Sequence, residues 1–194
     1  MKLLKIIIPC LVLGACVFGT SKNAKFYTPS AAAQGTVSTT FAGFVGINRI
    51  QLPKYLDRPQ MVTQTADSNQ VNVSEYNRWV ESPAVLATRV LTDDLNVLLP
   101  AAKIKINQFR GEGFEKTVFV EITDLTSVLG KQAQMTAWYT LKNKTGKTII
   151  QQKFTGSVQI GKTYDDVAQG YSQLLAQLSQ MIANTLLQNT QAAH

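Results

Sequence analysis

Histidine and cysteine are scarce in this chain of 194 residues: the only histidine is His194, and the only cysteines are Cys10 and Cys16. A Ser-His-Asp or Cys-His hydrolase needs an imidazole or an equivalent base beside its nucleophile, and terminal residues are seldom ordered. Zinc sites take three or four Cys or His ligands, more than this chain can supply. We therefore expect no catalytic residues, no metal site and no cofactor, and a protein that is not an enzyme.

Long apolar runs are also missing, because the stretch from Ile6 to Phe18 is shorter than the roughly 20 residues that span a bilayer. Lys2 and Lys5 precede this stretch, and small residues close it. That pattern is typical of a secretory signal. The sequence Leu13-Gly14-Ala15-Cys16 resembles a bacterial lipobox, so we expect a lipoprotein signal peptide over residues 1–15 and a mature chain that begins at an acylated Cys16.

Acylation also accounts for the odd thiol, because cleavage would remove Cys10 and leave Cys16 without a disulfide partner. One acyl chain binds a membrane only reversibly, whereas two or three chains anchor stably. Val17 stands where an aspartate often signals retention at the inner membrane. We therefore expect a lipid-anchored protein on the periplasmic face of the outer membrane, with no cofactor other than this covalent lipid.

Basic residues outnumber acidic ones, 19 to 12, and only two of them lie in the expected leader. This balance favours anionic surfaces, and after export the nearest ones are phospholipid head groups and acidic partner proteins. Nucleic acid is not an expected partner in that compartment.

The hydrophobic patterns predict one α+β domain over residues 41–190, after a flexible tether over residues 16–40 with a short strand at Phe26-Tyr27. Its mixed, mostly antiparallel sheet has two α-helices packed on one face. Predicted strands cover residues 43–50, 61–65, 71–73, 104–109, 117–122, 134–141 and 148–160. The first helix begins with an N-cap at Ser82 followed by Pro83, and it ends before Pro100.

The second helix begins at Thr163, where Asp166 completes a capping pattern. From Gly170 to Asn189 it carries no charged residue. An exposed helix usually carries charges, so its polar face either packs against a neighbour or a second copy of the chain, or is solvated without charge.

Residues Gly156 to Thr163 match the phosphate-loop pattern GxxxxGKT, which would make Lys162 an ATP-binding residue. The interior of the match, Val158 to Ile160, alternates like a continuing strand. Such a strand uses its N–H groups in a ladder and cannot cradle phosphates. No later strand follows to supply an aspartate for magnesium. An extended strand through Val158 to Ile160 would remove the nucleotide-binding hypothesis.

The segment from Val45 to Leu99 resembles the core of the ABC-type transport auxiliary lipoprotein family, the PqiC/YmbA group. Its most specific parts are Leu52-Pro53, Tyr55 to Gln60, and Arg78-Trp79 ahead of the capped helix. The lipobox, Phe26-Tyr27 and the later strands and helix extend the resemblance. Phe109 falls where the family often has a Phe-Asp pair, but here Arg110 follows.

This resemblance implies a non-enzymatic accessory lipoprotein of an MCE-type system, which moves phospholipid or other apolar molecules between the inner and outer membranes. The implied partners are an MCE-domain protein and the ABC permease and ATPase of the same system. A structural or envelope-assembly lipoprotein, contacting peptidoglycan or an outer-membrane barrel, is the alternative. Either kind of protein acts by docking.

The motif residues allow two interpretations. Tyr55, Asp57, Arg58, Arg78 and Trp79 either brace the proline-stiffened loop against the start of the first helix or form a partner-binding patch. Asp57 would pair with a residue near Arg58 or with Arg78, and Trp79 offers its face to a sheet edge or a cation. A further cluster either meets lipid head groups or is a solvated turn, and consists of Lys142, Lys144 and Lys147.

Overall fold

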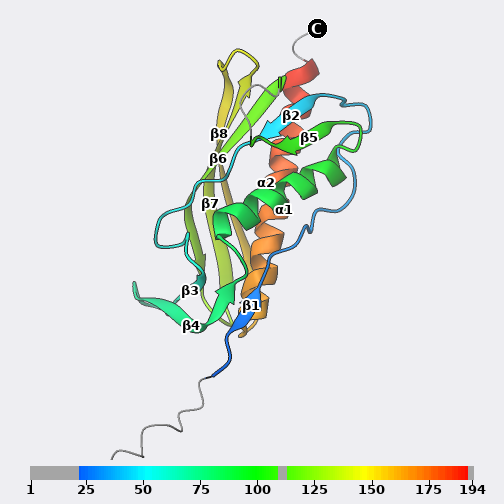
Figure 1. Cartoon of the computed structure of the whole chain (residues 1–194). Coiled ribbons are helices and arrows are strands. Elements are labelled where there is room, and N and C mark those ends of the chain that lie inside the picture. Colours follow the sequence, from blue (N-terminus) through cyan, green and yellow to red (C-terminus); the bar gives the residue numbers. More distant parts are fainter. Residues whose placement is uncertain (1–21, 109–112, 192–194) are drawn as a thin grey trace, which may run out of the picture.

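Two helices lie on one side of a long twisted sheet, and a smaller sheet stands at the end of the molecule where the described chain begins (Figure 1). This computed structural model describes residues 22–108 and 113–191. The predicted α+β class is confirmed. The predictions made on the signal peptide and the acylated cysteine lie outside the described residues, as do those on Phe109, Arg110 and His194.

The larger sheet has five strands in the order β5-β2-β6-β7-β8. Strand β2 is parallel to both of its neighbours, whereas β6, β7 and β8 are antiparallel. In β7 every second side chain is buried, as the alternation from Met135 to Leu141 predicts. The strands are β2 (Phe44–Ile47), β5 (Lys103–Ile106), β6 (Lys116–Ser127), β7 (Gln132–Asn143) and β8 (Thr148–Gln159).

The smaller sheet has the order β1-β4-β3, with β1 (Lys25–Tyr27), β3 (Gln60–Gln64) and β4 (Val71–Trp79). Strands β3 and β4 form the predicted hairpin, and β4 continues beyond its predicted end to Trp79. Strand β1 pairs in parallel with the last residues of β4. The prediction of a single sheet is therefore wrong in this detail, because the hairpin and β1 pair with each other and not with the larger sheet.

Helix α1 (Pro83–Leu98) and helix α2 (Tyr164–Gln191) pack against each other, and α2 also covers β7 and β8 (Figure 1). The predicted capping pattern of α2 is confirmed: the Thr163 backbone N–H and hydroxyl donate to Asp166 Oδ2 at 2.8 and 2.6 Å, and the Asp166 N–H donates back at 3.2 Å. These bonds hold the pKa of the Asp166 carboxyl below its ordinary value.

Burial of one face accompanies the lack of charge in α2 from Gly170 to Asn189. The hydroxyls of Ser172, Ser179 and Thr185 are buried, and each donates to the carbonyl four residues earlier. The Ser and Thr part of the polar face thus packs within the chain. The amide part is exposed and uncharged, as the second predicted alternative has it, and its exposed side chains, from just before Gly170 onward, are Gln169, Gln173, Gln177, Asn184 and Gln188.

The segment from 28 to 41, here called the N-terminal strap, was expected to be part of a tether. In the structure it is bound to the domain. Its Ala32 and Ala33 N–H groups donate to Asp94 Oδ1 at 2.9 and 2.8 Å, and its Val37 N–H donates to the Leu98 carbonyl at 2.8 Å. Phe41 at its end is buried. Attachment to the domain thus begins at β1, well before the predicted boundary.

The first half of the phosphate-loop match, Gly156 to Gln159, belongs to strand β8. Val158 and Gln159 pair with Ala133 and Gln132 of β7, and the Ile160 N–H donates to the Lys131 carbonyl at 3.1 Å. The glycines of the match serve packing: a Cβ on Gly156 would come within 2.6 Å of Phe154 Cζ, and one on Gly161 would overlap the Asp166 carboxylate. This outcome removes the nucleotide-binding hypothesis.

Candidate functional site

The loop from Pro53 to Pro59 forms a tight turn over the start of α1. The N–H groups of Leu56 and Asp57 both donate to the Pro53 carbonyl, at 2.9 and 3.1 Å. Leu56 points into the core and is 6 % exposed. Two prolines and these bonds fix the backbone, so the side chains of the loop have defined positions.

Asp57 is the centre of a polar cluster at the start of α1. Its Oδ1 accepts hydrogen bonds from the Ser82 hydroxyl at 2.6 Å and the Ala84 N–H at 3.3 Å. Its Oδ2 pairs with Arg49 Nη2 at 3.3 Å, and the same Nη2 donates to Ser82 Oγ at 3.0 Å. Asp57 thus joins the loop, the end of β2 and the helix start.

This geometry corrects two predictions. Ser82 occupies the N-cap position, but its side chain makes no capping bond to the helix backbone. Asp57 supplies that bond instead, where the positive end of the helix dipole favours a carboxylate. Its ionic partner is Arg49 and not Arg78. Sequence reasoning missed Arg49, because nothing in its spacing connects it to the loop.

Trp79 fastens the smaller sheet to the helices. Its backbone N–H donates to the Pro59 carbonyl at 2.7 Å. Its indole ring stacks on the Tyr171 ring of α2 with centroids 5.6 Å apart. The side chain is 5 % exposed, so it does not present its face to an external cation, as one interpretation had it. Burial raises the pKa of Tyr171 to about 12, and its hydroxyl oxygen accepts a hydrogen bond from Ser127.

The remaining three motif residues are one exposed tyrosine, Tyr55, and two half-buried arginines, Arg58 and Arg78. Tyr55 is 45 % exposed at the surface of the loop. Arg58 donates from Nε to Gln60 Oε1 at 3.3 Å. Within residues 22–108 and 113–191 the Arg78 guanidinium has no hydrogen-bond or ion-pair partner. The structure therefore gives Asp57 and Trp79 bracing contacts and leaves Tyr55, Arg58 and Arg78 available for other molecules.

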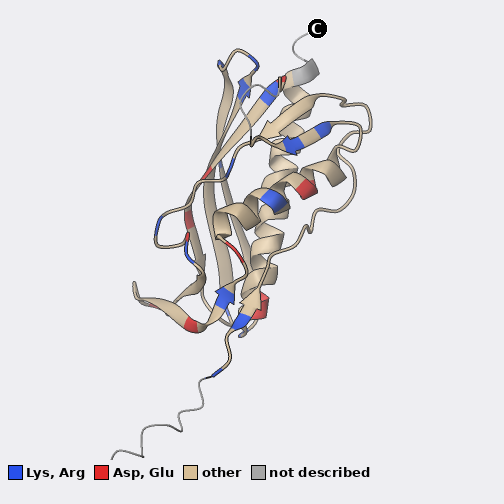
Figure 2. Cartoon of the chain, in the orientation of Figure 1, with Lys and Arg blue, Asp and Glu red and all other residues tan. Residues whose placement is uncertain are grey.

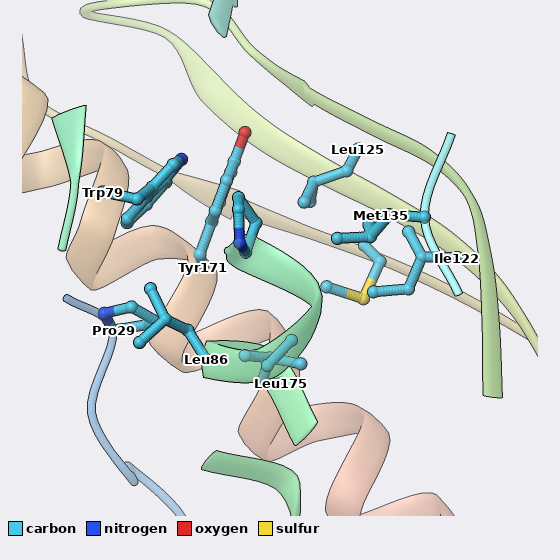
Figure 3. Close-up of a pocket in the computed structure, with 11 residues that line it drawn as sticks. Pro29, Trp79, Leu86, Ile122, Leu125, Met135, Tyr171 and Leu175 are labelled. Atoms are coloured by element: carbon cyan, nitrogen blue, oxygen red, sulfur yellow. The ribbon is translucent and has the colours of Figure 1, made fainter. Parts of the chain in front are cut away.

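A small apolar cavity lies behind the helix start (Figure 3). Trp79 and Tyr171 form one wall, and Leu125, Met135 and Ile122 lie opposite. Its volume is about 20 Å³. That is room for about one water molecule, which an apolar cavity does not favour, and far less than an acyl chain requires. The cavity is thus a packing gap and not a lipid site.

Basic and acidic residues are spread along the described helices and strands (Figure 2). In the described part of the chain no three His, Cys, Asp or Glu side chains gather as a metal site would require. Lys142, Lys144 and Lys147 lie at the β7–β8 turn, and Lys142 Nζ stands 4.7 Å from the Phe119 ring centroid. This turn is at the end of the molecule opposite β1 (Figure 1).

The loop, the braced helix and the two sheets together match a known family. The model of the ABC-type transport auxiliary lipoprotein component matches residues 27–183, so the chain belongs to that family. The match spans both sheets and most of α2, and it includes all five motif residues of the loop and the helix start. The family is one of cell-envelope lipoproteins that are accessory to ABC transport.

Solved structures confirm the fold. One is the crystal structure of an uncharacterized protein, with a TM-score of 0.69, 20 % identity, and coverage of 85 % of this chain and 99 % of the other. Another is protein XCC0632 from Xanthomonas campestris, with a TM-score of 0.71, 13 % identity, and coverage of 88 % and 99 %. A search of curated proteins found no match.

Neither described helix is long and apolar enough to cross a membrane.

Proposed function

We propose that this chain is a non-enzymatic accessory lipoprotein of an MCE-type transport system, which moves phospholipid or other apolar molecules between the inner and outer membranes. The observation that carries the proposal is the family match over residues 27–183. Its partners are an MCE-domain protein and the ABC permease and ATPase of the same system. The chain contributes by docking.

The anchor in this proposal is an acylated Cys16 that becomes the first residue after removal of residues 1–15. Val17 favours the periplasmic face of the outer membrane as its address. Only a short stretch separates Cys16 from β1, where the chain is bound to the domain. The domain therefore stands close to the membrane that holds it, and a partner arriving from the inner membrane must reach it there.

Docking on the proline-stiffened loop uses Tyr55 and Arg58. Both extend from a backbone that Pro53, Pro59 and the Asp57 cluster hold in place. An exposed tyrosine and an arginine on a rigid support are the residue types that contribute most to protein interfaces. Their positions need no rearrangement before a partner binds, which lowers the entropic cost of association.

The first prediction concerns the partners. After crosslinking in intact envelopes and purification through a C-terminal tag, we expect mass spectrometry to recover the MCE-domain protein with its permease and ATPase. Recovery of only peptidoglycan or an outer-membrane barrel would overturn the transport role in favour of the structural alternative.

Two variants sharpen this experiment. Tyr55→Ala combined with Arg58→Ala should lower partner recovery about tenfold, since losing two central interface side chains typically costs 1.4 kcal/mol or more. Lys162→Ala is the matched control and should leave recovery unchanged. Lys162 is the lysine of the phosphate-loop pattern, whose nucleotide-binding hypothesis the paired strand β8 removes. Equal recovery of both variants would place the docking surface elsewhere.

A further inference from the structure

The outer face of the smaller sheet exposes large apolar side chains that the domain core does not use. Phe26 is 62 % exposed, Tyr76 45 % and Val80 54 %. Arg78 stands among them, because Phe26 pairs with Arg78 in the parallel register of β1 and β4. Paired residues point to the same face of a sheet, and side chains two apart on one strand share a face.

The opposite face of the same sheet is the one that meets the domain. Tyr27 and Trp79 are paired in register, and Trp79 is buried against Tyr171. The Tyr27 hydroxyl donates to Asn77 Oδ1 at 3.0 Å on that side. The face that carries Phe26, Tyr76, Arg78 and Val80 is therefore turned away from the body of the molecule.

Arg78 is the one charged side chain that the described strands place on this outer face. Lys22 and Lys25 lie beside the face at the start of the described chain, and Glu75 and Glu81 lie beside it in β4 and just after β4. Aromatic rings with an arginine and lysines are the composition found where proteins meet the head-group region of a bilayer.

The place of this face in the molecule indicates what covers it. Strand β1 lies at the end of the molecule where the described chain begins, and the β7–β8 turn lies at the far end (Figure 1). An extended chain spans at most about 3.6 Å per residue, so Phe26 lies no more than roughly 36 Å from Cys16. A membrane that holds Cys16 is therefore within reach of the face.

From these observations we propose that the outer face of the smaller sheet, formed by Phe26, Tyr76, Arg78 and Val80, rests on the anionic lipid surface to which the chain is anchored. This inference relies on the lipid anchor of the proposed function but not on any transport partner. It sets the orientation of the domain, with the β7–β8 turn directed away from the membrane.

The experiment uses the mature acylated lipoprotein in vesicles of phosphatidylethanolamine and phosphatidylglycerol, without other proteins. Phe26→Cys and Val80→Cys each carry a nitroxide, and Ile149→Cys carries the control label, because Ile149 is a 37 % exposed apolar residue beside the far turn. Collisions with oxygen report lipid and collisions with a nickel chelate report water. At positions 26 and 80 we expect an oxygen-to-nickel ratio at least threefold that at position 149.

A charge variant tests the electrostatic part. Arg78→Glu should bring the ratio at position 26 down toward the control value, whereas Lys144→Glu at the far turn should leave it unchanged. Replacing phosphatidylglycerol by phosphatidylcholine should act in the same direction as Arg78→Glu.

Three outcomes would overturn the inference. Equal ratios at 26, 80 and 149 would show that the face is in water. Labels shielded from both oxygen and nickel would show that protein covers the face, and gel filtration would reveal a second copy. If the vesicles float and the protein does not float with them, the lipid anchor is contradicted, and with it the contact between the face and the membrane. Because the vesicles hold no transport proteins, none of these results bears on partner recovery.

Discussion

Asp94 is a buried carboxylate that joins the N-terminal strap to both helices. Its Oδ1 accepts the Ala32 and Ala33 N–H bonds, and its Oδ2 lies 3.3 Å from the hydroxyl of Ser179 on α2, whose one proton is shared with the Leu175 carbonyl. Burial raises the pKa of Asp94 above its ordinary value, although these hydrogen bonds act in the opposite direction. A cationic partner is absent from its surroundings in the described residues, so its ionised form carries a desolvation cost.

Two variants of Asp94 should therefore separate the contribution of its hydrogen bonds to stability from the contribution of its charge. Asp94→Ala leaves two N–H groups of the strap without acceptors and should lower the free energy of unfolding by about 2 kcal/mol. Asp94→Asn keeps an acceptor oxygen and serves as the matched control. Urea unfolding followed by circular dichroism measures both variants, and equal losses would show that the strap bonds contribute little.

The charge of Asp94 gives a pH dependence with a defined sign. A folded-state pKa above the unfolded value means that the folded chain binds this proton more tightly. The resulting stabilisation is complete below the unfolded pKa of about 3.9 and is lost as pH rises through the folded pKa. The stability of Asp94→Asn relative to the natural chain should therefore increase between acid and neutral pH. A decrease over that range would contradict the assignment.

Asp57 should contribute through the helix cap more than through its ion pair. Asp57→Ala removes the acceptor for Ser82 and Ala84 and should cost about 1 to 2 kcal/mol of unfolding free energy. Asp57→Asn keeps the acceptor and loses only the exposed pair with Arg49, which should cost about 0.5 kcal/mol. Chemical unfolding measures both variants, and an equal cost for both would show that the ion pair dominates.

Residues close in sequence were easier to predict than residues brought together by the fold. The cap formed by Thr163 and Asp166 involves residues three apart, so the pattern can be recognised in the sequence. The bond from Ser82 to Asp57 joins residues 25 apart, and the one from Ala32 to Asp94 joins residues 62 apart. Such polar pairs leave no periodic signal, and Arg49 and Asp94 were therefore missed.

At the scale of elements, α2 approaches β8 through a glycine. A Cβ on Gly170 would lie 2.6 Å from Ile160 Cγ2 and 3.4 Å from Ala133 Cβ. Neither neighbour is the end of a long flexible side chain, so the helix itself would have to shift. The close packing of α2 on β8 thus depends on the absence of a side chain at this position.

Gly170→Ala should consequently destabilise the fold although alanine favours helix formation by about 1 kcal/mol. Overpacking typically costs 1 to 3 kcal/mol, so we expect a net loss of about 1 kcal/mol in chemical unfolding. Gln173→Ala, at an exposed position one turn further on, is the control and should be neutral. Ile160→Ala itself removes a buried apolar side chain, so the double variant should lose less stability than the sum of the two single variants, and strict additivity of the two changes would argue against the contact.

Element prediction succeeded where one face of a segment is buried. The alternation along β7 and the apolar stripe of α2 both follow directly from side-chain periodicity. The assignment of strands to sheets did not follow, because β1 pairs with residues about fifty positions later in β4. A three-residue strand has no pattern that identifies its partner, so the separate smaller sheet could not be foreseen.

At the scale of the whole molecule, the described surfaces divide into two ends with different chemistry. The end with β1 carries exposed aromatic residues together with residues of both charge signs, and the end with the β7–β8 turn carries a lysine cluster (Figure 2). The proline-stiffened loop lies between them on the side of the molecule. A domain standing on its first end would present the loop laterally and the far turn to the periplasm.

The parallel pairing of β1 with β4 has a mechanical consequence under the proposed anchor at Cys16. A partner that pulled such an anchored domain away from its membrane would load β1 before any other described element, because β1 is the first described segment bound to the body. The three residues of β1 hold through their short ladder and the 3.0 Å bond from the Val80 N–H to the Tyr27 carbonyl. If they detach, the next bond to bear the force is the one from the Ser30 N–H to Ser172 Oγ at 3.0 Å, followed by the two bonds from Ala32 and Ala33 to Asp94 Oδ1.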